Sequence, residues 1–319
     1  MMQNIIAENQ LAFYVIVVAA SLYLMAKASD LAVYGVSRYA RKLGLSDYII
    51  GMVVVAIASS MPELVSSITG AAAGEPGIVL GTLFGSNLAG LALVLGISTI
   101  LSKKISTKSK VLEGTNKLIW ILVMLPFALL LDGNLTRFDG FVLVGAYFFY
   151  IIYLWRKEGK LGKVKKKVKI ENLWKDGFVF SGSLVVILLS ARYLVFSSIM
   201  LANYVGIDPY IVALTIIAIG ATMPDIMVSI KSAKQGHQGV GYGNVVGSMV
   251  IKALLFLGAI AIITPIEFAF VELLNIMIFR TIMITLVLWW ATKNFITWKQ
   301  GVTLLVIYLI FLIIQILLG

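Results

Sequence analysis

Two apolar stretches of the chain each contain a proline followed directly by a carboxylate: Pro62 precedes Glu63, and Pro224 precedes Asp225. A proline inside a helix cannot donate to the carbonyl four residues earlier and clashes with it, so each motif frees a backbone carbonyl oxygen. In an apolar environment, such carbonyls are tolerated only where protein or a cavity satisfies them. We therefore expect the carboxylates and the freed carbonyls to face the interior of the protein.

Hydroxyl groups accompany both motifs. Ser59 lies four residues before Glu63, and Ser229 lies four residues after Asp225, so each hydroxyl shares a helical face with its carboxylate. Carboxylate, hydroxyl and carbonyl oxygens suit a hard cation such as Ca²⁺ or Na⁺ rather than a soft metal. A proline kink alone can serve packing, and a lone carboxylate can bond a neighbouring helix. Two such motifs are costly in lipid unless they function, which favours an ion site.

Composition indicates that these motifs lie in a membrane protein. Of the 319 residues, 60% are hydrophobic and 13% are charged, and the mean hydropathy is +0.99. These values exclude a soluble enzyme, a disordered chain and a coiled coil. The sequence has no cysteine and one histidine, which excludes a thiolate metal site and a histidine cluster.

Hydropathy predicts about ten transmembrane helices, because one span needs about 20 apolar residues. The predicted limits are residues 11–39, 47–73, 78–101, 116–132, 138–156, 177–203, 209–233, 239–264, 270–292 and 298–318.

The sequence also matches itself, without a gap, when it is shifted by 162 residues. The matched pairs include Met61 with Met223, Pro62 with Pro224, Gly85 with Gly247 and Ser86 with Ser248. Each half has about five spans, an odd number, so the two halves must be inverted relative to each other. Inverted repeats are the framework of secondary transporters, whose site lies between the repeats near the midplane. The predicted fold class is an all-α polytopic membrane protein with about ten transmembrane helices in two inverted five-helix repeats.

Lysine and arginine set the expected orientation. If the first short loop lies inside, the inside loops hold 21 of the 26 basic residues and the outside loops hold only Arg137. Both termini are then expected outside, and the net charge of +11 reflects topology, with anionic lipid rather than nucleic acid as its neighbour. The domain prediction is a first repeat at 1–156, a basic cytoplasmic linker at 157–176 and a second repeat at 177–319.

Residues 56–63 and 218–225 resemble the two alpha-repeats of the calcium/cation antiporter superfamily, and within it the sodium/calcium exchangers of prokaryotic type. Segments 81–87 and 243–248 resemble the glycine–serine segments that follow them. Their glycines, at a spacing of four, are expected to be packing surfaces. The resemblance implies a plasma-membrane antiporter that exchanges Ca²⁺ for Na⁺ by alternating access, in which the long first and sixth spans move past a fixed core.

The resemblance also implies a set of ion ligands. Glu63 and Asp225 would ligate Ca²⁺. The hydroxyl groups that would help to form the Na⁺ sites belong to Ser59, Ser60, Thr222, Ser86 and Ser248. Backbone carbonyls near Ala56, Ser59, Ala218 and Ala221 would contribute too. Asp225 is shorter than the usual Glu, and Ala221 replaces a hydroxyl residue.

Lys252 is the largest departure from the family pattern, which usually has Asp or Asn at this position. The equivalent position of the first half, where Asn or Asp is also usual, is Gly90. Lys252 lies four residues after Ser248 on one helical face, so its ammonium should point toward the expected oxygen ligands of the ion site. It sits mid-span, too deep to snorkel easily. With both acids ionised, a protonated Lys252 changes the site from a net charge of −2 to −1.

Three interpretations of Lys252 stay open. Its ammonium could act as a tethered cation that lowers the number of Na⁺ ions needed. It could instead lose its proton when Ca²⁺ enters, because buried lysines shift their protonation readily, and exchange would then be coupled to H⁺. A permanent salt bridge to an acid would lock the site and leave a membrane scaffold or sensor that does not transport. A channel is a further possibility, which ion leak without exchange would reveal.

The sequence therefore predicts a cation antiporter, with Ca²⁺ and Na⁺ (or H⁺) as transported ions and membrane lipids as neighbours. We expect no enzyme activity and no cofactor, and neither nucleic acid nor a protein partner is implied.

Overall fold

The computed structural model describes residues 2–42, 49–107, 114–159, 173–234, 238–267 and 270–318. Of the predicted linker at 157–176, only 157–159 and 173–176 belong to this described part, where they extend helices; the remainder lies outside it.

The first half contains α1 (Met2–Lys42), η1 (Ile50–Val55), α3 (Ala56–Ser59), α4 (Met61–Ala72), α5 (Pro76–Leu80), η2 (Gly81–Gly85), α6 (Ser86–Ala89), η3 (Gly90–Val94), α7 (Leu95–Ser102), β1 (Lys104–Ser106), α8 (Asn116–Leu129), β2 (Asn134–Leu135) and α9 (Arg137–Gly159). The second half contains α10 (Leu173–Val205), α11 (Pro209–Val212), η4 (Ala213–Ile217), α12 (Ala218–Ala221), α13 (Met223–Lys234), α14 (Gln238–Val250), η5 (Ile251–Phe256), α15 (Leu257–Ile263), β3 (Ile266–Glu267), α16 (Phe270–Ala291), β4 (Phe295–Thr297) and α17 (Trp298–Leu318). The η segments are π-helical turns within longer helices.

Within the described residues, seven helices are long and apolar enough to cross a membrane, or eight if the bent pair Gly51–Ser59 and Met61–Ala72 forms one span. Two further apolar helices, Asn116–Leu129 and Tyr210–Ala221, are shorter. The polytopic helical fold class is therefore confirmed, whereas the count of ten spans stays a prediction.

The two helices that carry the glycine–serine segments form the centre of the bundle. The apolar window of Pro76–Ser102 is 94% buried, and that of Gly239–Ile263 is 78% buried. Glycine allows these helices to approach their neighbours closely, as predicted. A Cβ atom on Gly85 would lie 2.9 Å from Leu214 Cδ1, and one on Gly247 would collide with the backbone of Met52. Gly85 and Gly247 are equivalent positions, and so are Leu214 and Met52, so each half packs its central helix against the broken helix of the other half.

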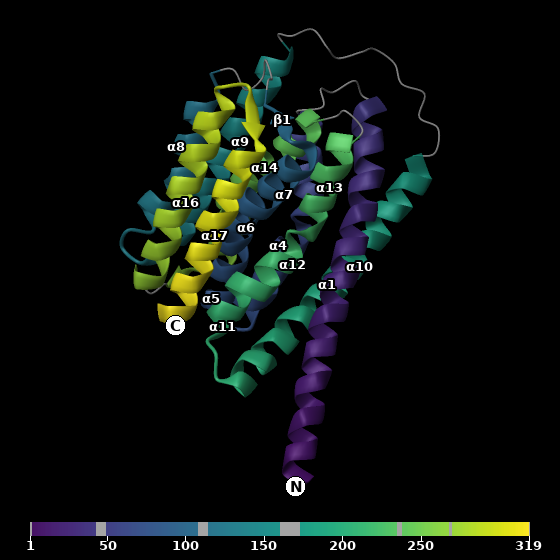
Figure 1. Cartoon of the computed structure of the whole chain (residues 1–319), viewed down its shortest axis with the longest axis vertical. Helices are drawn as coiled ribbons and strands as arrows, with labels where there is room; N and C mark the ends of the chain where they lie inside the picture. The colour runs from purple at the N-terminus through teal and green to yellow at the C-terminus, as the bar shows by residue number, and fades with distance from the viewer. Residues whose placement is uncertain are drawn as a thin grey trace.

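The long helices α1 and α10 pack against each other at the side of this bundle. In Figure 1, α1 (purple) runs from the N-terminus along the bundle and crosses α10 (teal). Large apolar side chains on both helices, including Phe13 and Ile16 on α1 and Leu188 and Phe196 on α10, are exposed. Lipid is the medium that such a surface requires. The helix predicted at 11–39 is longer than expected, since α1 begins at Met2.

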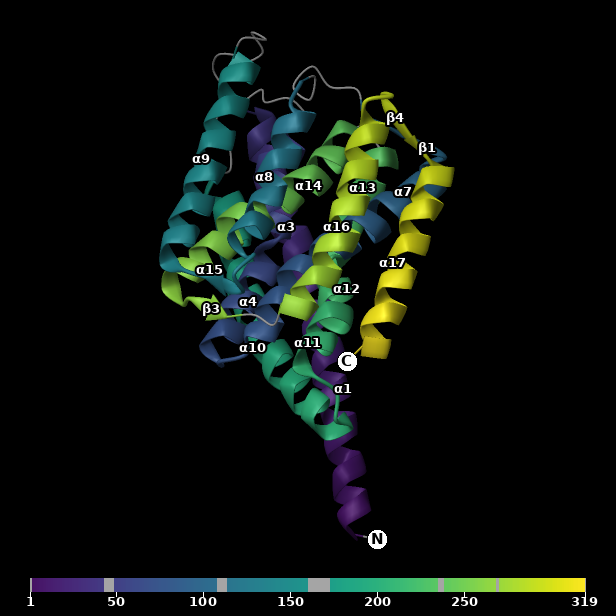
Figure 2. The same ribbon diagram turned by 90° about the vertical axis from the view of Figure 1, so that its left-hand side faces the viewer.

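Two short antiparallel ribbons depart from a purely α-helical fold class. β1 pairs with β4, and β2 pairs with β3, so each ribbon joins a loop of the first half to a loop of the second. In Figure 2, β1 and β4 lie at the upper end of the bundle and β3 lies toward the lower end. Runs of only two or three residues are too short for a strand pattern to be read from sequence.

Candidate ion-binding site

Both carboxylates of the proline motifs lie in the first turn of a helix that follows a break. Glu63 belongs to α4, which bends 47° from the preceding helix. The break falls at Ser60, whose φ of −91° and ψ of 4° leave the helical region. Thr222, with φ −80° and ψ −6°, is the equivalent break before Asp225 in the second half. The breaks are located where the prolines predict them.

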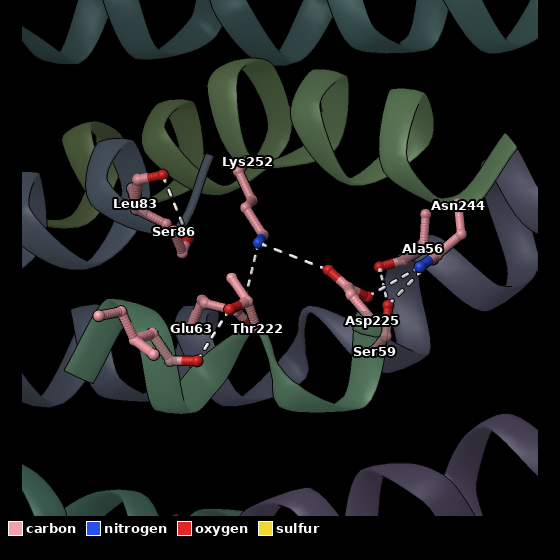
Figure 3. A network of polar contacts seen from close by, with 10 residues as sticks. Ala56, Ser59, Glu63, Leu83, Ser86, Thr222, Asp225, Asn244 and Lys252 are labelled. Carbon is pink, nitrogen blue, oxygen red and sulfur yellow. Dashed lines mark hydrogen bonds and ion pairs between the residues drawn. The ribbon is translucent and has the colours of Figure 1, made fainter. Parts of the chain in front are cut away.

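Lys252 lies between the two carboxylates (Figure 3). Its Nζ is 2.6 Å from Oε1 of Glu63 and 4.0 Å from Oδ2 of Asp225. All three side chains are almost fully buried, with exposures of 0% for Glu63 and 1% for Asp225 and Lys252. The ammonium of Lys252 was expected to point toward the oxygen ligands, and in the structure it contacts Glu63 from a π-helical turn. One ammonium from η5 bridges the acids of the two halves.

Asn244 of α14 is a member of the site that the sequence reasoning did not assign. Its Nδ2 donates to Oδ1 of Asp225 at 2.9 Å, and its Oδ1 accepts from Oγ of Ser59 at 3.1 Å. The amide therefore connects an acid of the second half to a hydroxyl of the first. A signal was available: Asn244 lies four residues before Ser248 and is a fully buried polar residue in an apolar span.

Several predicted hydroxyl and carbonyl ligands are engaged within their own helices. Oγ of Ser86 donates to the Leu83 carbonyl at 3.3 Å, and Oγ1 of Thr222 donates to the Ile219 carbonyl at 2.8 Å. The Ala56 carbonyl accepts from the backbone of Ser60 and from Oγ of Ser59. The Ala218 carbonyl accepts from the backbone of Thr222, and Ala221 is buried beside this break. Ala56, Ala218, Ala221 and Thr222 lie at or before the two breaks, whereas Ser86 belongs to the central helix α6.

Other oxygen atoms of the site have no hydrogen-bond partner among the described residues. They are Oε2 of Glu63 and the Oγ atoms of Ser60 and Ser248, and all three are buried. A buried oxygen without a partner pays a desolvation cost that a bound cation would offset. Thr82, equivalent to Asn244 in the first half, likewise has a buried Oγ1 without a partner within the described part of the chain.

The chemistry of the site is that of hard oxygen ligands beside a fixed ammonium. Within the described residues, no three His, Cys, Asp or Glu side chains come together, so two acids supply the anionic ligands. A cation that binds both Glu63 and Asp225 must displace Nζ of Lys252 from the position between them. The ion pair at 2.6 Å is compatible with a tethered cation and with a locked site, and these two interpretations differ in whether the pair can open.

Comparison with known proteins matches both halves of the chain to one family. The sequence profile of the family described as sodium/calcium exchanger protein matches residues 13–156 and 176–317, which cover both halves. The sodium/calcium exchanger MaX1 of Methanosarcina acetivorans is 27% identical to the chain, over 92% of this chain and 95% of that protein. The inner membrane protein YrbG of Escherichia coli is 28% identical, over 84% of this chain and 86% of that protein.

Solved structures give the same result. The sodium–calcium exchanger NCX_Mj, soaked with 2.5 mM Na⁺ and 1 mM Sr²⁺, superimposes with a TM-score of 0.72 at 28% sequence identity. The match covers 93% of this chain and 96% of that one.

Proposed function

The chain belongs to the sodium/calcium exchanger family, and on that premise we propose that it exchanges Ca²⁺ for Na⁺ across a membrane by alternating access. The family comprises multi-pass membrane transporters rather than enzymes. The observation that carries the proposal is the meeting of Glu63 and Asp225, one from each half, on either side of a single cationic group. Two buried acids at the interface of two repeats are a typical site of ion transport.

We assign the following roles. Ca²⁺ binds between Glu63 and Asp225 after Lys252 moves aside. The Na⁺ sites use hydroxyl and carbonyl oxygens around the two breaks, from Ser59, Ser60, Ala56, Ala218, Ala221, Thr222, Ser86 and Ser248. Oε2 of Glu63 has no hydrogen-bond partner among the described residues. It supports the assignment of Glu63 to Ca²⁺, because it is a carboxylate oxygen that Lys252 does not occupy.

The proposed architecture has ten spans, which count Asn116–Leu129 and the broken helix 209–234 in addition to the eight longer ones. The two halves, 1–156 and 177–319, are inverted around a cytoplasmic linker, and both termini face outward from the plasma membrane. Packing of α1 and α10 against each other and against the broken helices supports their movement as a pair past the central core.

The test uses purified protein in liposomes loaded with Na⁺. With no membrane voltage applied, accumulation of Ca²⁺ above its outside concentration should follow the outward Na⁺ gradient and stop when Na⁺ is equal on both sides. Glu63→Gln and Asp225→Asn should each abolish this uptake. Ser98→Ala, which removes a buried hydroxyl without a partner among the described residues, is the matched control and should keep it. Full uptake by both acid variants would reject the site.

The short Lys252–Glu63 contact supports a second function. In it, Lys252 releases its proton as Ca²⁺ binds, and exchange is coupled to H⁺. Uptake driven by a pH gradient in Na⁺-free liposomes would establish this version. A locked site would give no uptake under either gradient.

A further inference from the structure

The buried charges of the protein balance one another. Among the described residues, the buried side chains that carry a formal charge are Glu63, Asp225, Lys252 and Arg280. Two acids and two bases sum to zero in their ordinary charge states. A transporter core that is neutral in the membrane needs no additional ion for compensation.

Arg280 of α16 contributes the second positive charge. Its side chain is 0% exposed, and its guanidinium carbon lies 4.9 Å from the ring centroid of Phe84 and 4.8 Å from that of Phe127. Cation–π contacts of this kind stabilise a desolvated guanidinium. None of its three nitrogen atoms has a hydrogen-bond partner within the described part of the chain. Phe84 lies two residues before Ser86, so Arg280 packs against the central helix of the first half.

Each of the two acids has a polar contact from a side chain of the protein, although Oε2 of Glu63 has no hydrogen-bond partner among the described residues. Lys252 contacts Glu63 at 2.6 Å, and Asn244 donates to Asp225 at 2.9 Å. A transporter that has released its cation must close over its own ligands before it can return. Two bare carboxylates in a low-dielectric core would oppose that closure, whereas a paired and hydrogen-bonded set permits it.

We propose that Lys252 serves as a built-in return ion, so that the protein also carries a divalent cation in one direction without exchanging it for Na⁺ or H⁺. The inference rests on the Ca²⁺ site of the proposed function. Ca²⁺ displaces Nζ from Glu63 and binds the two acids, and the loaded core crosses with two positive charges. After release, Nζ returns to Glu63 and the neutral core reverses. Each cycle therefore moves two charges, and membrane voltage drives it.

The experiment uses the full chain in Na⁺-free liposomes with the same strongly buffered pH on both sides. An outward K⁺ gradient with valinomycin sets an inside-negative voltage, and trapped indicators report Ca²⁺ and pH. The wild-type protein should take up Ca²⁺ saturably and without movement of protons. A tenfold K⁺ gradient should support about 100-fold accumulation, because each of the two charges contributes a factor of ten.

Two variants separate the charge of Lys252 from its other properties. Lys252→Arg keeps the tethered cation and should keep voltage-driven uptake. Lys252→Gln removes it and should reduce this uptake at least tenfold, with monodisperse elution as the folding control. Equal voltage-driven uptake by Lys252→Gln and the wild type would overturn the inference.

The wild-type measurement is decisive even if a variant does not fold. Uptake that follows Na⁺ or pH gradients but never voltage alone would overturn the return-ion inference and leave exchange intact. Absence of Ca²⁺ uptake under every gradient would overturn the proposed function and this inference with it.

Discussion

The polar side chains at the centre of the molecule form one connected path between the two halves. The path runs from Glu63 to Lys252 and Asp225, and then through Asn244 to Ser59. Ser59 lies one helical turn before Glu63, so the path returns to the segment on which it began. A change at one member therefore leaves a neighbour without its partner.

Asn244→Ala tests this path at the level of a single residue. Removal of the amide leaves Asp225 Oδ1 without its donor from Asn244 and leaves Ser59 Oγ with only the Ala56 carbonyl as acceptor. A buried polar group left unsatisfied costs about 1–3 kcal/mol, so we expect a stability loss of about that size. Thermal unfolding in Ca²⁺-free buffer measures it.

The equivalent residue of the first half provides the control. Thr82→Ala removes a buried hydroxyl that has no partner in the described part of the chain, so it should leave the unfolding temperature almost unchanged. Equal losses for the two variants would mean that the Asn244 bonds contribute nothing specific.

Part of the site could be predicted from the sequence because helical spacing and the 162-residue internal repeat are both regular. Helical spacing placed Lys252 beside the acids, and the repeat placed Glu63 opposite Asp225. The roles of individual hydroxyls were not predictable in the same way. Ser86 and Thr222 bond carbonyls of their own helices, a choice that sequence spacing does not reveal.

At the level of elements, four of the five π-helical turns of the described residues occur in pairs at equivalent positions of the two halves, whereas η2 has no counterpart. η1 corresponds to η4, and η3 corresponds to η5, which carries Lys252. Such turns are frequent at functional sites. One extra residue in a turn rotates everything after it by about 100°, yet it leaves the apolar pattern of a fully buried helix unchanged. Sequence periodicity therefore predicted the helices but not these turns.

The close approach of the central helices gives a prediction about stability. In Gly247→Ala, the added methyl would meet the backbone carbonyl of Met52, which cannot move aside. We expect a loss of about 1–3 kcal/mol, the usual cost of overpacking. At Gly90, no heavy atom lies within 4 Å of an added Cβ, so Gly90→Ala should not destabilise the protein. Unfolding temperatures in detergent compare the two, and similar values would contradict the proposed interleaving.

The contact between α1 and the second broken helix gives a prediction about movement. A Cβ on Gly220 would lie 2.8 Å from Cδ1 of Leu22, a flexible side-chain end that can shift without unfolding. If α1 moves past α12 during transport, the methyl of Gly220→Ala should raise the activation free energy of that movement. Overpacking costs about 1–3 kcal/mol, so Ca²⁺ uptake should slow about tenfold. The initial rate of uptake measures this effect.

A second change and a control identify the cause. Leu22→Ala in the same chain should restore the rate of Gly220→Ala by returning the space. Gly182→Ala on α10, with no heavy atom within 4 Å of the added Cβ, should transport normally. Failure of Leu22→Ala to rescue the rate would exclude this contact as the point of movement.

For the whole molecule, internal repetition made the helical fold predictable, whereas the pairing of the two ribbons could not be predicted. β1 and β3 occupy equivalent positions of the two halves, as do β2 and β4. The ribbon β1·β4 and strand β3 lie toward opposite ends of the bundle in Figure 2, which is the arrangement that inversion requires. The pairing itself depends on contacts between segments more than 100 residues apart, which no local pattern reports.

Inversion can be tested from the two ribbons, since the sequence contains no cysteine to interfere. Phe295 of β4 and Asn134 of β2 are both exposed. Phe295→Cys and Asn134→Cys, each as the only cysteine, should react with a membrane-impermeant maleimide from opposite sides of the membrane in intact cells and inverted vesicles. Lys103 and Lys293 flank β1 and β4, and Lys104 belongs to β1, so position 295 should react from the cytoplasm. Reaction of both cysteines from one side would be incompatible with inverted halves, and with a site in which Glu63 and Asp225 meet from oppositely oriented helices.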